Sequence, residues 1–412
     1  MRVRIAVVLL IGSLLKASGS ENWPEFRGRT GEGTSDATGL PLTWSETEHV
    51  RWKTVIPGEG WSSPVIDGNQ VWMQTALDEG KSLRAVCVER NSGKILHDVE
   101  VFYIANPERK HAFNSYASPT PAIENGRVYI SYGMYGIACI DAATGKVVWK
   151  NMELKHDHDK NGPGSSPILY KDLLILNCDG TELRYVAAID KKTGKTAWKT
   201  DRSNTINKAG EFKKAYQTPL IIRMHGRDQL VSMGAFRVSG YEPLTGKEIW
   251  WVDIPGFSNV PRPIFGHGLV YVSTGFGKPE LWAIRPDGHG DVTRTHVAWK
   301  VLKQVPAKPS PLLIGEQFYM ISDNGIATCL DGKTGKELWS ERIPGAYSAS
   351  PIYADGRIFA PNEQGQTIVL QPGPKFQVAA TNVLDDGFMS SPAVAGKAFY
   401  LRTKKRLYRI EN

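Results

Sequence analysis

The sequence has 412 residues, a charged fraction of 22%, a hydrophobic fraction of 41% and a formal net charge of +8. This composition is ordinary for a folded protein and excludes an intrinsically disordered chain. Lysine and arginine are scattered, and the single basic run, Lys404–Arg406, is too short to form a nucleic-acid surface. We therefore expect no nucleic-acid partner.

The first twenty residues have the features of a secretory signal peptide. Two arginines precede an apolar run from Ile5 to Leu15, and small residues follow up to Ser20. We predict a signal peptide over residues 1–20, removed near Ser20, and an extracytoplasmic location, either periplasmic or secreted. The apolar run is too short to span a bilayer and no later run is longer, so we expect no transmembrane segment.

A leader segment, residues 21–49, precedes a repeat that occupies residues 50–412. Each repeat opens with a Ser-x-Pro-like sequence at the start of a predicted strand, where proline costs no ladder hydrogen bond. The spacing of these prolines is typical of one four-stranded propeller blade each. The eight prolines are Pro64, Pro119, Pro167, Pro219, Pro263, Pro311, Pro351 and Pro392.

Within a repeat, hairpin signals such as Asn125-Gly126 connect the first strand to the second. The third strand ends in an Asp-x-x-Thr-Gly-Lys-like turn, and a fourth strand carries a tryptophan that we expect to pack between neighbouring blades. Blade one has Ile95 and Leu96 near this position, and blade seven has Phe376. The tryptophans are Trp149, Trp198, Trp250, Trp339, and Trp299 after an expanded turn over residues 285–296.

The last repeat ends after three strands. The segment Val50–Thr54 supplies the missing fourth strand, because Trp52-Lys53-Thr54 repeats Trp198-Lys199-Thr200. Pairing the two ends of the chain removes the open edges of the ring. We therefore predict an all-β, eight-bladed β-propeller of four-stranded antiparallel blades, closed by pairing of the N- and C-terminal strands.

The cysteines do not form a redox or metal motif. Three of the four occupy one third-strand position, which is filled by alanine or glycine in other repeats and therefore requires a small side chain. We predict that no disulfide is needed for folding, with a Cys87–Cys139 bridge between adjacent blades as the alternative. The three cysteines are Cys87, Cys139 and Cys329, and the small residues are Ala188, Gly240 and Ala283.

Together, the Ser-x-Pro openings, the Asp-x-x-Thr-Gly-Lys turns and the tryptophan strands resemble the pyrroloquinoline-quinone-like (PQQ-like) propeller repeat. That family includes quinoprotein dehydrogenases and the outer-membrane assembly scaffold BamB. The opening Trp23–Gly28, followed by Gly31-Glu32-Gly33, looks like the leader of a group of exported propellers. The chain differs from the dehydrogenases in lacking adjacent cysteines, and from BamB-type scaffolds in lacking a cysteine after the signal.

One mouth of the central channel is the place where propellers usually bind ligands. Aromatic, acidic and basic residues that enter the first strands, or follow the second, should converge there. This pattern predicts a site for a protein partner or for a small polar ligand such as a saccharide. The candidates are Trp61, Tyr116, Asp179, Glu182, Tyr216, Arg237, Arg262, Asp323, Asn324 and Tyr347.

Two groups of residues carry side chains of the types that bind metal ions. The run His156, Asp157, His158 and Asp159 has ligand types, but without a second, distant group it is more typical of a solvated loop. Asp179 and Glu182 would hold calcium if Asn177 and Asn324 joined them, as a quinone enzyme requires.

We expect an exported, non-catalytic binding scaffold, a monomer with a role like that of BamB in envelope assembly. The alternative is a PQQ-dependent quinoprotein dehydrogenase that oxidises alcohols or sugars. No cofactor is predicted for the scaffold, whereas the alternative needs PQQ and calcium. The sequence does not identify the ligand or partner.

Overall fold

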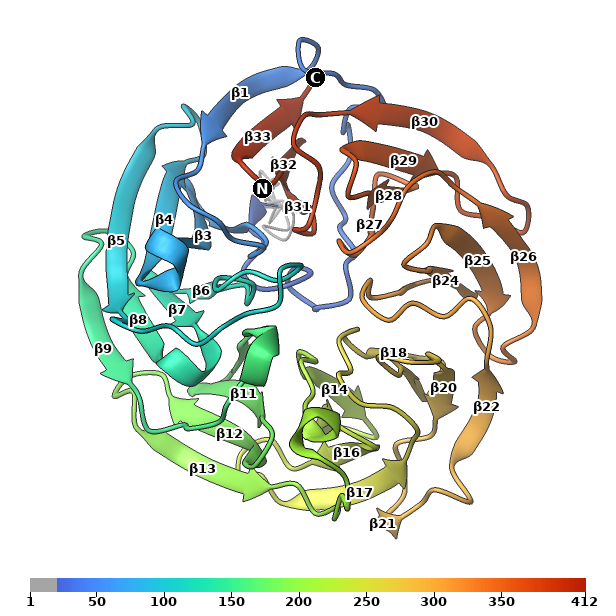
Figure 1. Ribbon diagram of the computed structural model, residues 1–412. Helices are drawn as coiled ribbons and strands as arrows, with labels where there is room; N and C mark the ends of the chain where they lie inside the picture. The colour runs from blue at the N-terminus through green and yellow to red at the C-terminus, as the bar shows by residue number, and fades with distance from the viewer. Residues whose placement is uncertain (1–20) are drawn as a thin grey trace, which may run out of the picture.

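Eight antiparallel sheets form a ring around a central channel in the computed structural model, which describes residues 21–412 (Figure 1). This confirms the predicted eight-bladed propeller. The predicted signal peptide lies outside the described residues. Within residues 21–412, no helix has the length and apolar character needed to cross a bilayer.

The blades follow one another in chain order. Blade 1 consists of β2 (Val65–Asp67), β3 (Gln70–Leu77), β4 (Ser82–Glu89) and β5 (Ile95–Tyr103). Blade 2 consists of β6 (Ala122–Glu124), β7 (Arg127–Ser131), β8 (Ile137–Asp141) and β9 (Val147–Asn151). Blade 3 consists of β10 (Ile168–Tyr170), β11 (Leu173–Asp179), β12 (Arg184–Asp190) and β13 (Thr196–Asp201). Blade 4 consists of β14 (Leu220–Met224), β15 (Arg227–Gly234), β16 (Arg237–Tyr241) and β17 (Glu248–Asp253).

The second half of the ring repeats this order. Blade 5 consists of β18 (Ile264–Gly266), β19 (Leu269–Ser273), β20 (Leu281–Ile284) and β22 (Val297–Val301). Its expanded turn contributes β21 (Gly290–Asp291), which pairs in parallel with β17 of blade 4. Blade 6 consists of β23 (Leu312–Ile314), β24 (Gln317–Ile321), β25 (Ile326–Asp331) and β26 (Glu337–Arg342). Blade 7 consists of β27 (Ile352–Ala354), β28 (Arg357–Pro361), β29 (Gln366–Leu370) and β30 (Val378–Val383).

Blade 8 joins the two ends of the chain. Its inner strands are β31 (Ala393–Ala395), β32 (Ala398–Arg402) and β33 (Arg406–Glu411), and its outer strand is β1 (Val50–Val55). β1 pairs antiparallel with β33, with Lys53 opposite Tyr408. The predicted closure of the ring is therefore confirmed.

Burial follows the position of a strand in its blade. The inner strand β11 is buried at every residue, whereas half-buried and exposed residues alternate along the outer strand β13. An inner strand is covered on both faces by the neighbouring blades, so it is mainly apolar, and the polar residues of β11, Asn177 and Asp179, are hydrogen-bonded. The core is thus divided among the interfaces between blades.

Five fourth-strand tryptophans lie between neighbouring blades, as predicted, and each forms a hydrogen bond to the next blade. The indole Nε1 of Trp149 donates to the carbonyl oxygen of Lys191, in the turn of blade 3, at 3.0 Å. Equivalent bonds of 2.9–3.1 Å are made by Trp52, Trp198, Trp299 and Trp339. The turn glycine permits this approach, because a Cβ at Gly194 (φ +74°) would lie 2.5 Å from the Trp149 ring.

Three blade interfaces depart from this arrangement. Trp250 is fully buried over Gly240 of its own blade and donates to Gln229, which in turn donates to Pro286 of blade 5. In blade 1 the fourth-strand position is filled by His97, which stacks on Trp72. Trp250 therefore packs between blades as predicted, in a hydrophobic cluster with Val270 and Trp282 of blade 5, although its indole N–H is bonded within its own blade.

Blade 7 has Ala380 at the tryptophan position, opposite Val369. Phe376 precedes β30 and packs edge-on against Trp339, so its proposed place in the fourth strand is wrong. A tryptophan of the leader supplies the aromatic packing that Ala380 does not provide at this interface. The Trp44 ring contacts both Phe359 of blade 7 and Phe399 of blade 8.

The cysteines are buried and unpaired. Cys139 and Cys329 lie opposite Trp149 and Trp339 in the ladders, so the predicted small-residue position is real. The alternative Cys87–Cys139 bridge is not formed. Burial raises the pKa of the Cys139 thiol to about 12, which keeps it protonated and unreactive at neutral pH.

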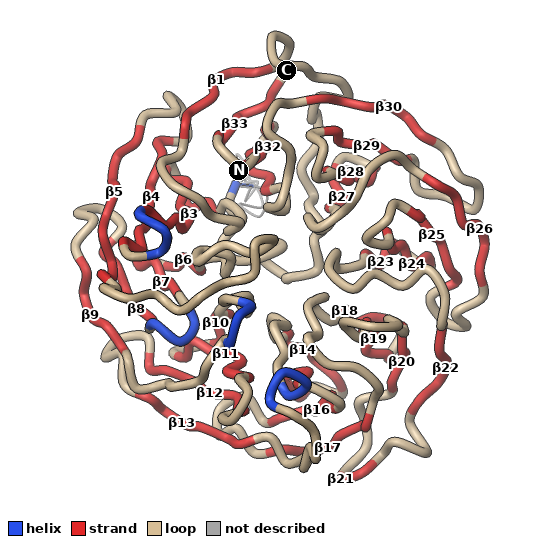
Figure 2. The backbone as a smooth tube through the Cα atoms, viewed as in Figure 1, coloured by secondary structure: helices blue, strands red, loops and turns tan. Residues whose placement is uncertain are grey.

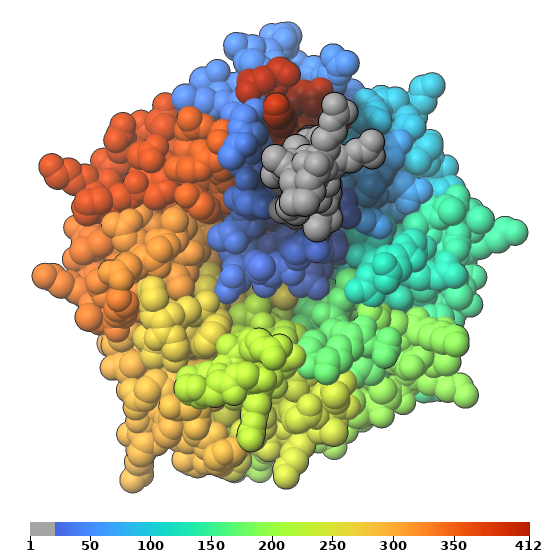
Figure 3. Space-filling view, turned by 180° about the vertical axis from the view of Figure 1, so that it is seen from behind, coloured from blue at the N-terminus to red at the C-terminus, as the bar shows by residue number. Residues whose placement is uncertain are grey.

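The leader crosses the rear of the channel, where it is visible as the blue segment at the centre of Figure 3. Its backbone bonds to the inner strands of several blades in turn. Trp23 pairs with Ile66 of blade 1, and the carbonyl of Pro24 accepts from Ile123 of blade 2. Further along, Thr34 pairs with Tyr353 of blade 7. The leader therefore closes the rear end of the channel.

Two buried arginines hold the leader in place. The Arg27 guanidinium donates to the carbonyls of Glu32, Pro311 and Pro351 at 2.6–3.1 Å. Burial lowers the pKa of Arg27 to about 9, which still leaves it charged at neutral pH. Arg262 forms an ion pair of 3.0 Å with the buried Glu25. The leader motif noted in the sequence thus serves this attachment.

We predict that Gly194→Ala destabilises the protein more than Gly226→Ala. Both glycines have similar positive φ values, but a Cβ at Gly226 meets nothing within 4 Å. Gly226→Ala should cost about 1 kcal/mol from backbone strain, and Gly194→Ala about 1–3 kcal/mol more from overpacking against Trp149. Urea unfolding of both variants measures the difference. Equal losses would contradict the indole–glycine contact.

We predict that Arg27→Met lowers the free energy of unfolding by roughly 2–4 kcal/mol, because buried carbonyls lose charged donors. Arg29→Met is the control, since Arg29 is exposed two residues away. Proteolysis of the native protein should also cut the leader faster in Arg27→Met. An Arg27→Met protein as stable and resistant as Arg29→Met would show that the leader is not fixed by this side chain.

Candidate functional site

A cavity of about 800 Å³ opens at the end of the channel opposite the leader. Figure 2 shows loops from several blades converging at this centre. Its base includes Phe26 of the leader, and its wall includes the 3-10 turns Asp159–Asn161 and Gly210–Lys213. We call it the front cavity. Because the leader closes the rear, the front cavity is blind.

A ring of hydroxyl groups lines the front cavity. Each of seven repeat prolines is directly preceded by serine or threonine, and the hydroxyl oxygen accepts from the backbone N–H of the equivalent residue in the preceding blade, at 2.9–3.1 Å. Within residues 21–412, none of these hydroxyls donates to a protein acceptor, so their O–H groups remain available. This hydroxyl ring comprises Ser63, Thr120, Ser166, Thr218, Ser310, Ser350 and Ser391.

The hydroxyl ring corrects one repeat assignment. Thr120 occupies the ring position of blade 2, and β6 begins directly after Pro121. Pro121 is therefore the repeat proline, and the assignment of Pro119 is wrong. The serine or threonine immediately before each of these prolines is visible in the sequence, where it predicts a strand opening but not a ring of hydroxyl groups.

Aromatic side chains form much of the cavity wall. Phe257 contacts Phe212 with ring centroids 4.9 Å apart and Phe276 with centroids 5.9 Å apart. Phe276 is 71% exposed at the rim. Trp61 lies on the wall formed by the blade 1 and blade 2 loops, where its Nε1 donates to the carbonyl of Phe113. The wall thus presents ring faces and edges to a ligand.

The charged groups of the front cavity are paired within the protein. Lys214 lies 2.9 Å from Asp159, and Lys160 lies 3.5 Å from Glu211. Lys308 lies 3.6 Å from Asp323 and 3.4 Å from Glu363. The cavity therefore offers no strong excess of either charge.

The structure brings three of the ten predicted mouth residues into the front cavity: Trp61, Tyr216 and Asp323. Burial raises the pKa of Tyr216, so its phenol is a neutral hydrogen-bond donor. Asp323 accepts from the backbone N–H of Ala307 at 2.7 Å. The sequence missed Phe113, Phe212, Phe257 and Lys308, which lie on loops of irregular length.

The other predicted residues do not line the cavity. Tyr116 and Tyr347 donate to backbone carbonyls, and Arg237 pairs with Asp253 at 2.7 Å. Glu182 and Asn324 are exposed at other points of the loops.

Arg262 was a candidate ligand contact, but it is buried and bound to Glu25 and the leader. Asp179 is buried and receives two hydrogen bonds from Arg202, at 2.9 and 2.6 Å. Asn177 is bound to Gln217 and Ser232. Two of the four residues predicted to bind calcium are thus occupied by protein partners, and the other two, Glu182 and Asn324, are exposed outside the cavity.

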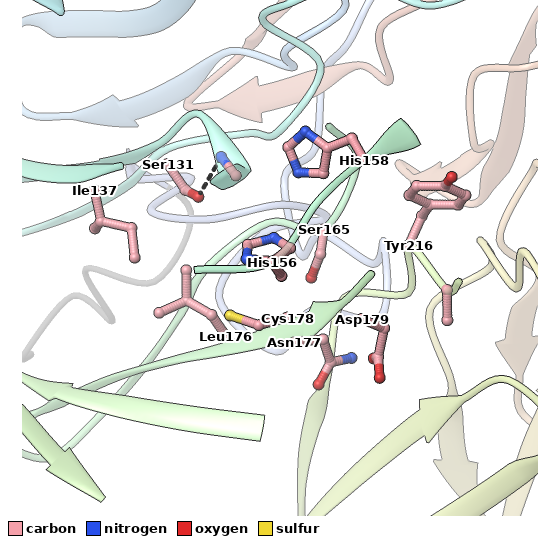
Figure 4. A pocket seen from close by; sticks show the side chains of 13 residues that line it. Ser131, Ile137, His156, His158, Ser165, Leu176, Asn177, Cys178, Asp179 and Tyr216 are labelled. Atoms are coloured by element: carbon pink, nitrogen blue, oxygen red, sulfur yellow. Dashed lines mark hydrogen bonds between the residues drawn. The ribbon is translucent and has the colours of Figure 1, made fainter. Parts of the chain in front are cut away.

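Two histidines of the predicted metal cluster lie beside a small cavity of about 20 Å³, which has room for one water molecule (Figure 4). The rings of His156 and His158 are 5.1 Å apart. The two aspartates of the cluster do not join the histidines. The Asp157 carboxylate accepts a hydrogen bond from the Thr181 hydroxyl, and the Asp159 carboxylate accepts one from Lys214. Over residues 21–412, no three His, Cys, Asp or Glu side chains are placed to hold a metal ion.

The tautomer of His158 also opposes metal binding. Its Nε2 accepts from the backbone N–H of Met134 at 3.2 Å, so in the neutral ring Nδ1 carries the proton. That Nδ1 is buried and has no hydrogen-bond partner among the described protein atoms. Burial holds the pKa of His158 well below its usual range, and it also lowers the pKa of His156. Both rings are therefore neutral at pH 7.

A comparison with protein families gives one match. Residues 184–412, more than half of the chain, match the family described as outer membrane protein assembly factor BamB. The chain belongs to this family. No curated protein matches the sequence.

Solved structures share the propeller fold. BamB from Moraxella catarrhalis has a TM-score of 0.60 and 12% identity, over 88% of this chain and 97% of that chain. A europium-containing methanol dehydrogenase has a TM-score of 0.69 and 12% identity, over 93% and 89%. The quinohemoprotein alcohol dehydrogenase ADHIIG from Pseudomonas putida HK5 has a TM-score of 0.64 and 11% identity, over 96% and 81%. At identities this low, the structural similarity establishes the fold alone. The same fold occurs in an assembly factor and in dehydrogenases.

We predict that the protein loses stability as the pH falls below about 6.5, the pKa of histidine in an unfolded chain. Because burial depresses the pKa of His158 in the folded state, the unfolded chain binds the proton first, and stability is complete only above that pH. His158→Gln, which keeps an acceptor for Met134, should flatten the decline in melting temperature between pH 7 and pH 5. His289→Gln, at an exposed site, is the control and should behave like the wild type.

Proposed function

We propose that this protein is a non-catalytic binding scaffold that holds its ligand in the front cavity. The observation that carries the proposal is the combination of a large blind cavity, aromatic walls and charged groups that are already paired. Volumes of about 300–1,000 Å³ are usual for ligand sites. The occupant is a segment of a protein partner or a small polar ligand.

The cavity lacks the arrangement expected of an active site. Catalysis by a serine hydroxyl needs an adjacent base, but the ring hydroxyls are hydrogen-bonded to backbone N–H groups, and no hydrogen bond to histidine is found for them in residues 21–412. The lysines that line the cavity are bound to carboxylates. These contacts favour binding over chemistry.

The quinone alternative fits these residues poorly. Pyrroloquinoline quinone is a planar tricarboxylate, so its site needs available cations, and the alternative set out above needs a calcium ion bound by oxygen ligands. Asp179 is occupied by Arg202, and Glu182 is exposed away from the cavity. The donor set therefore does not match the group.

Family membership and the predicted signal peptide support a setting for this scaffold. We infer an extracytoplasmic monomer with a role in envelope assembly, as the BamB description of the family suggests. The net positive charge is spread over the chain and supports neither a nucleic-acid partner nor a membrane anchor.

The mature protein, immobilised, should retain ligands or partners from an envelope extract through the front cavity. Val260→Trp adds a large side chain at the cavity wall and should reduce capture at least tenfold. Val148→Trp makes the same change on the outer strand β9, where Val148 is 47% exposed, and should capture as the wild type does. Proteins and small molecules are identified by mass spectrometry.

A parallel assay with added quinone, calcium and an electron-accepting dye tests the alternative. We expect no turnover of alcohols or aldose sugars. Turnover that is lost in Val260→Trp would overturn the scaffold proposal, as would capture that is unaffected by this variant.

A further inference from the structure

The front cavity has features that specify a class of ligand, on the assumption that it is the binding site proposed above. We propose that it binds the terminal sugars of a neutral oligosaccharide. Four properties of the cavity lead to this assignment: its donors, its aromatic faces, its charge balance and its closed base.

The donors suit a ligand rich in oxygen acceptors. The hydroxyl ring places O–H groups around the axis, and each oxygen is fixed by a backbone N–H of the neighbouring blade, as between Thr120 and Ser166. The phenol of Tyr216 accepts from Asn161 at 2.9 Å, which leaves its own O–H free to donate. Sugar hydroxyl and ring oxygens accept such bonds and can donate in return.

The aromatic wall suits the apolar faces of sugar rings. The negative face of an aromatic ring attracts the C–H groups that a pyranose presents on one side. Phe276 lines the cavity and is 71% exposed; Phe113 also lines it and is 40% exposed, but Lys308 Nζ lies 4.2 Å from its ring centroid and covers one face. Large aromatic groups left open beside hydroxyl donors match a ligand that is apolar on its faces and polar at its edges.

The charge balance favours an uncharged ligand. A carboxylate or phosphate group would need a cation, but the lysines of the cavity are paired with Asp159, Glu211 and Asp323. Breaking such a pair leaves a carboxylate without its partner, which is costly when the group is partly desolvated. A neutral sugar binds without disturbing these pairs.

The closed base determines which part of the oligosaccharide enters. Phe26 and the leader lie across the rear of the channel, so a chain cannot thread through the propeller. A cavity of about 800 Å³ is larger than one sugar ring requires and is open at one end only. The end of a chain of a few sugars therefore enters, and the rest extends from the mouth.

Titration calorimetry of the mature protein with three neutral trisaccharides, maltotriose, cellotriose and triacetylchitotriose, tests the proposal. We expect saturable binding to at least one of them, changing less than about twofold between low and high salt, because screening acts on charged partners. Val260→Trp should weaken binding at least tenfold, whereas Val148→Trp should not change it. Met389→Trp, at another wall position, provides a second blocked cavity should Val260→Trp unfold.

A substitution in the hydroxyl ring tests the donor contribution. Ser166→Ala should weaken sugar binding several-fold, and Ser166→Thr, which retains the hydroxyl, should remain close to the wild type. A six-glucose cyclodextrin, which is a closed ring without a chain end, should bind more weakly than linear maltohexaose.

Three outcomes would overturn the assignment. The first is salt-dependent binding of a glucuronate-containing oligosaccharide without binding of the neutral trisaccharides. The second is cavity-dependent binding of unstructured decapeptides alone, which would leave the scaffold proposal intact. The third is sugar binding unchanged in both blocked variants, which would place the ligand elsewhere and remove the support for both proposals.

Discussion

The attachment of neighbouring blades at two distances from the axis, made at five of the eight interfaces, is the constraint on which this propeller depends. Near the axis, the hydroxyl before the repeat proline accepts a backbone N–H from the preceding blade, as between Ser310 and Ser350. At the periphery, an indole N–H reaches the turn of the following blade, as between Trp149 and Lys191. Two separated attachments fix the angle between neighbouring sheets, which a ring must reproduce at every interface in order to close.

The leader shows how a polar centre is stabilised in such a ring. The inner ends of the strands direct carbonyl oxygens at the channel, and Arg27 satisfies those of Pro311 and Pro351 with one guanidinium. Arg262 replaces the hydroxyl of blade 5 and binds Glu25. The same contacts close the rear of the channel, so the channel becomes a cavity that is open only at the front. The binding surface at the front therefore depends on a segment that lies outside the repeats.

The sequence predicted those features that recur with the repeat. Trp52 identified the closing strand because it stands in a pattern shared with Trp198, and the equivalence of Cys139 with Ala188 showed a small-residue position in the third strand. The same method fails at Pro119, where Pro121 two residues later is the true equivalent. It placed Trp250 between blades 4 and 5, but it did not show that the indole N–H of Trp250 binds Gln229 of its own blade rather than the turn of the next.

The site was less predictable because its residues come from irregular loops and from outside the repeat. Arg262 and Asp179 were sensible candidates by type and position, but each is bound to a residue distant in sequence, Glu25 or Arg202. Phe113 and Phe257 reach the cavity through loops whose path the repeat does not determine. The hydroxyl ring was the accessible signal, because it is encoded by the residue that precedes each proline.

The pairing of β1 with β33 also sets the order of events during synthesis. β1 is the first strand to be synthesised, but it can pair only after β33 has been made, since Val50 lies beside Ile410. The intervening blades can stack as they are synthesised. An incomplete ring, however, leaves β1 without its partner strand, and the backbone N–H and C=O groups of β1 stay unpaired. Contacts between such distant residues form slowly, because a long loop must close first. The ring therefore closes only after β33 has been made, and the shorter nascent arcs are the forms most prone to aggregation.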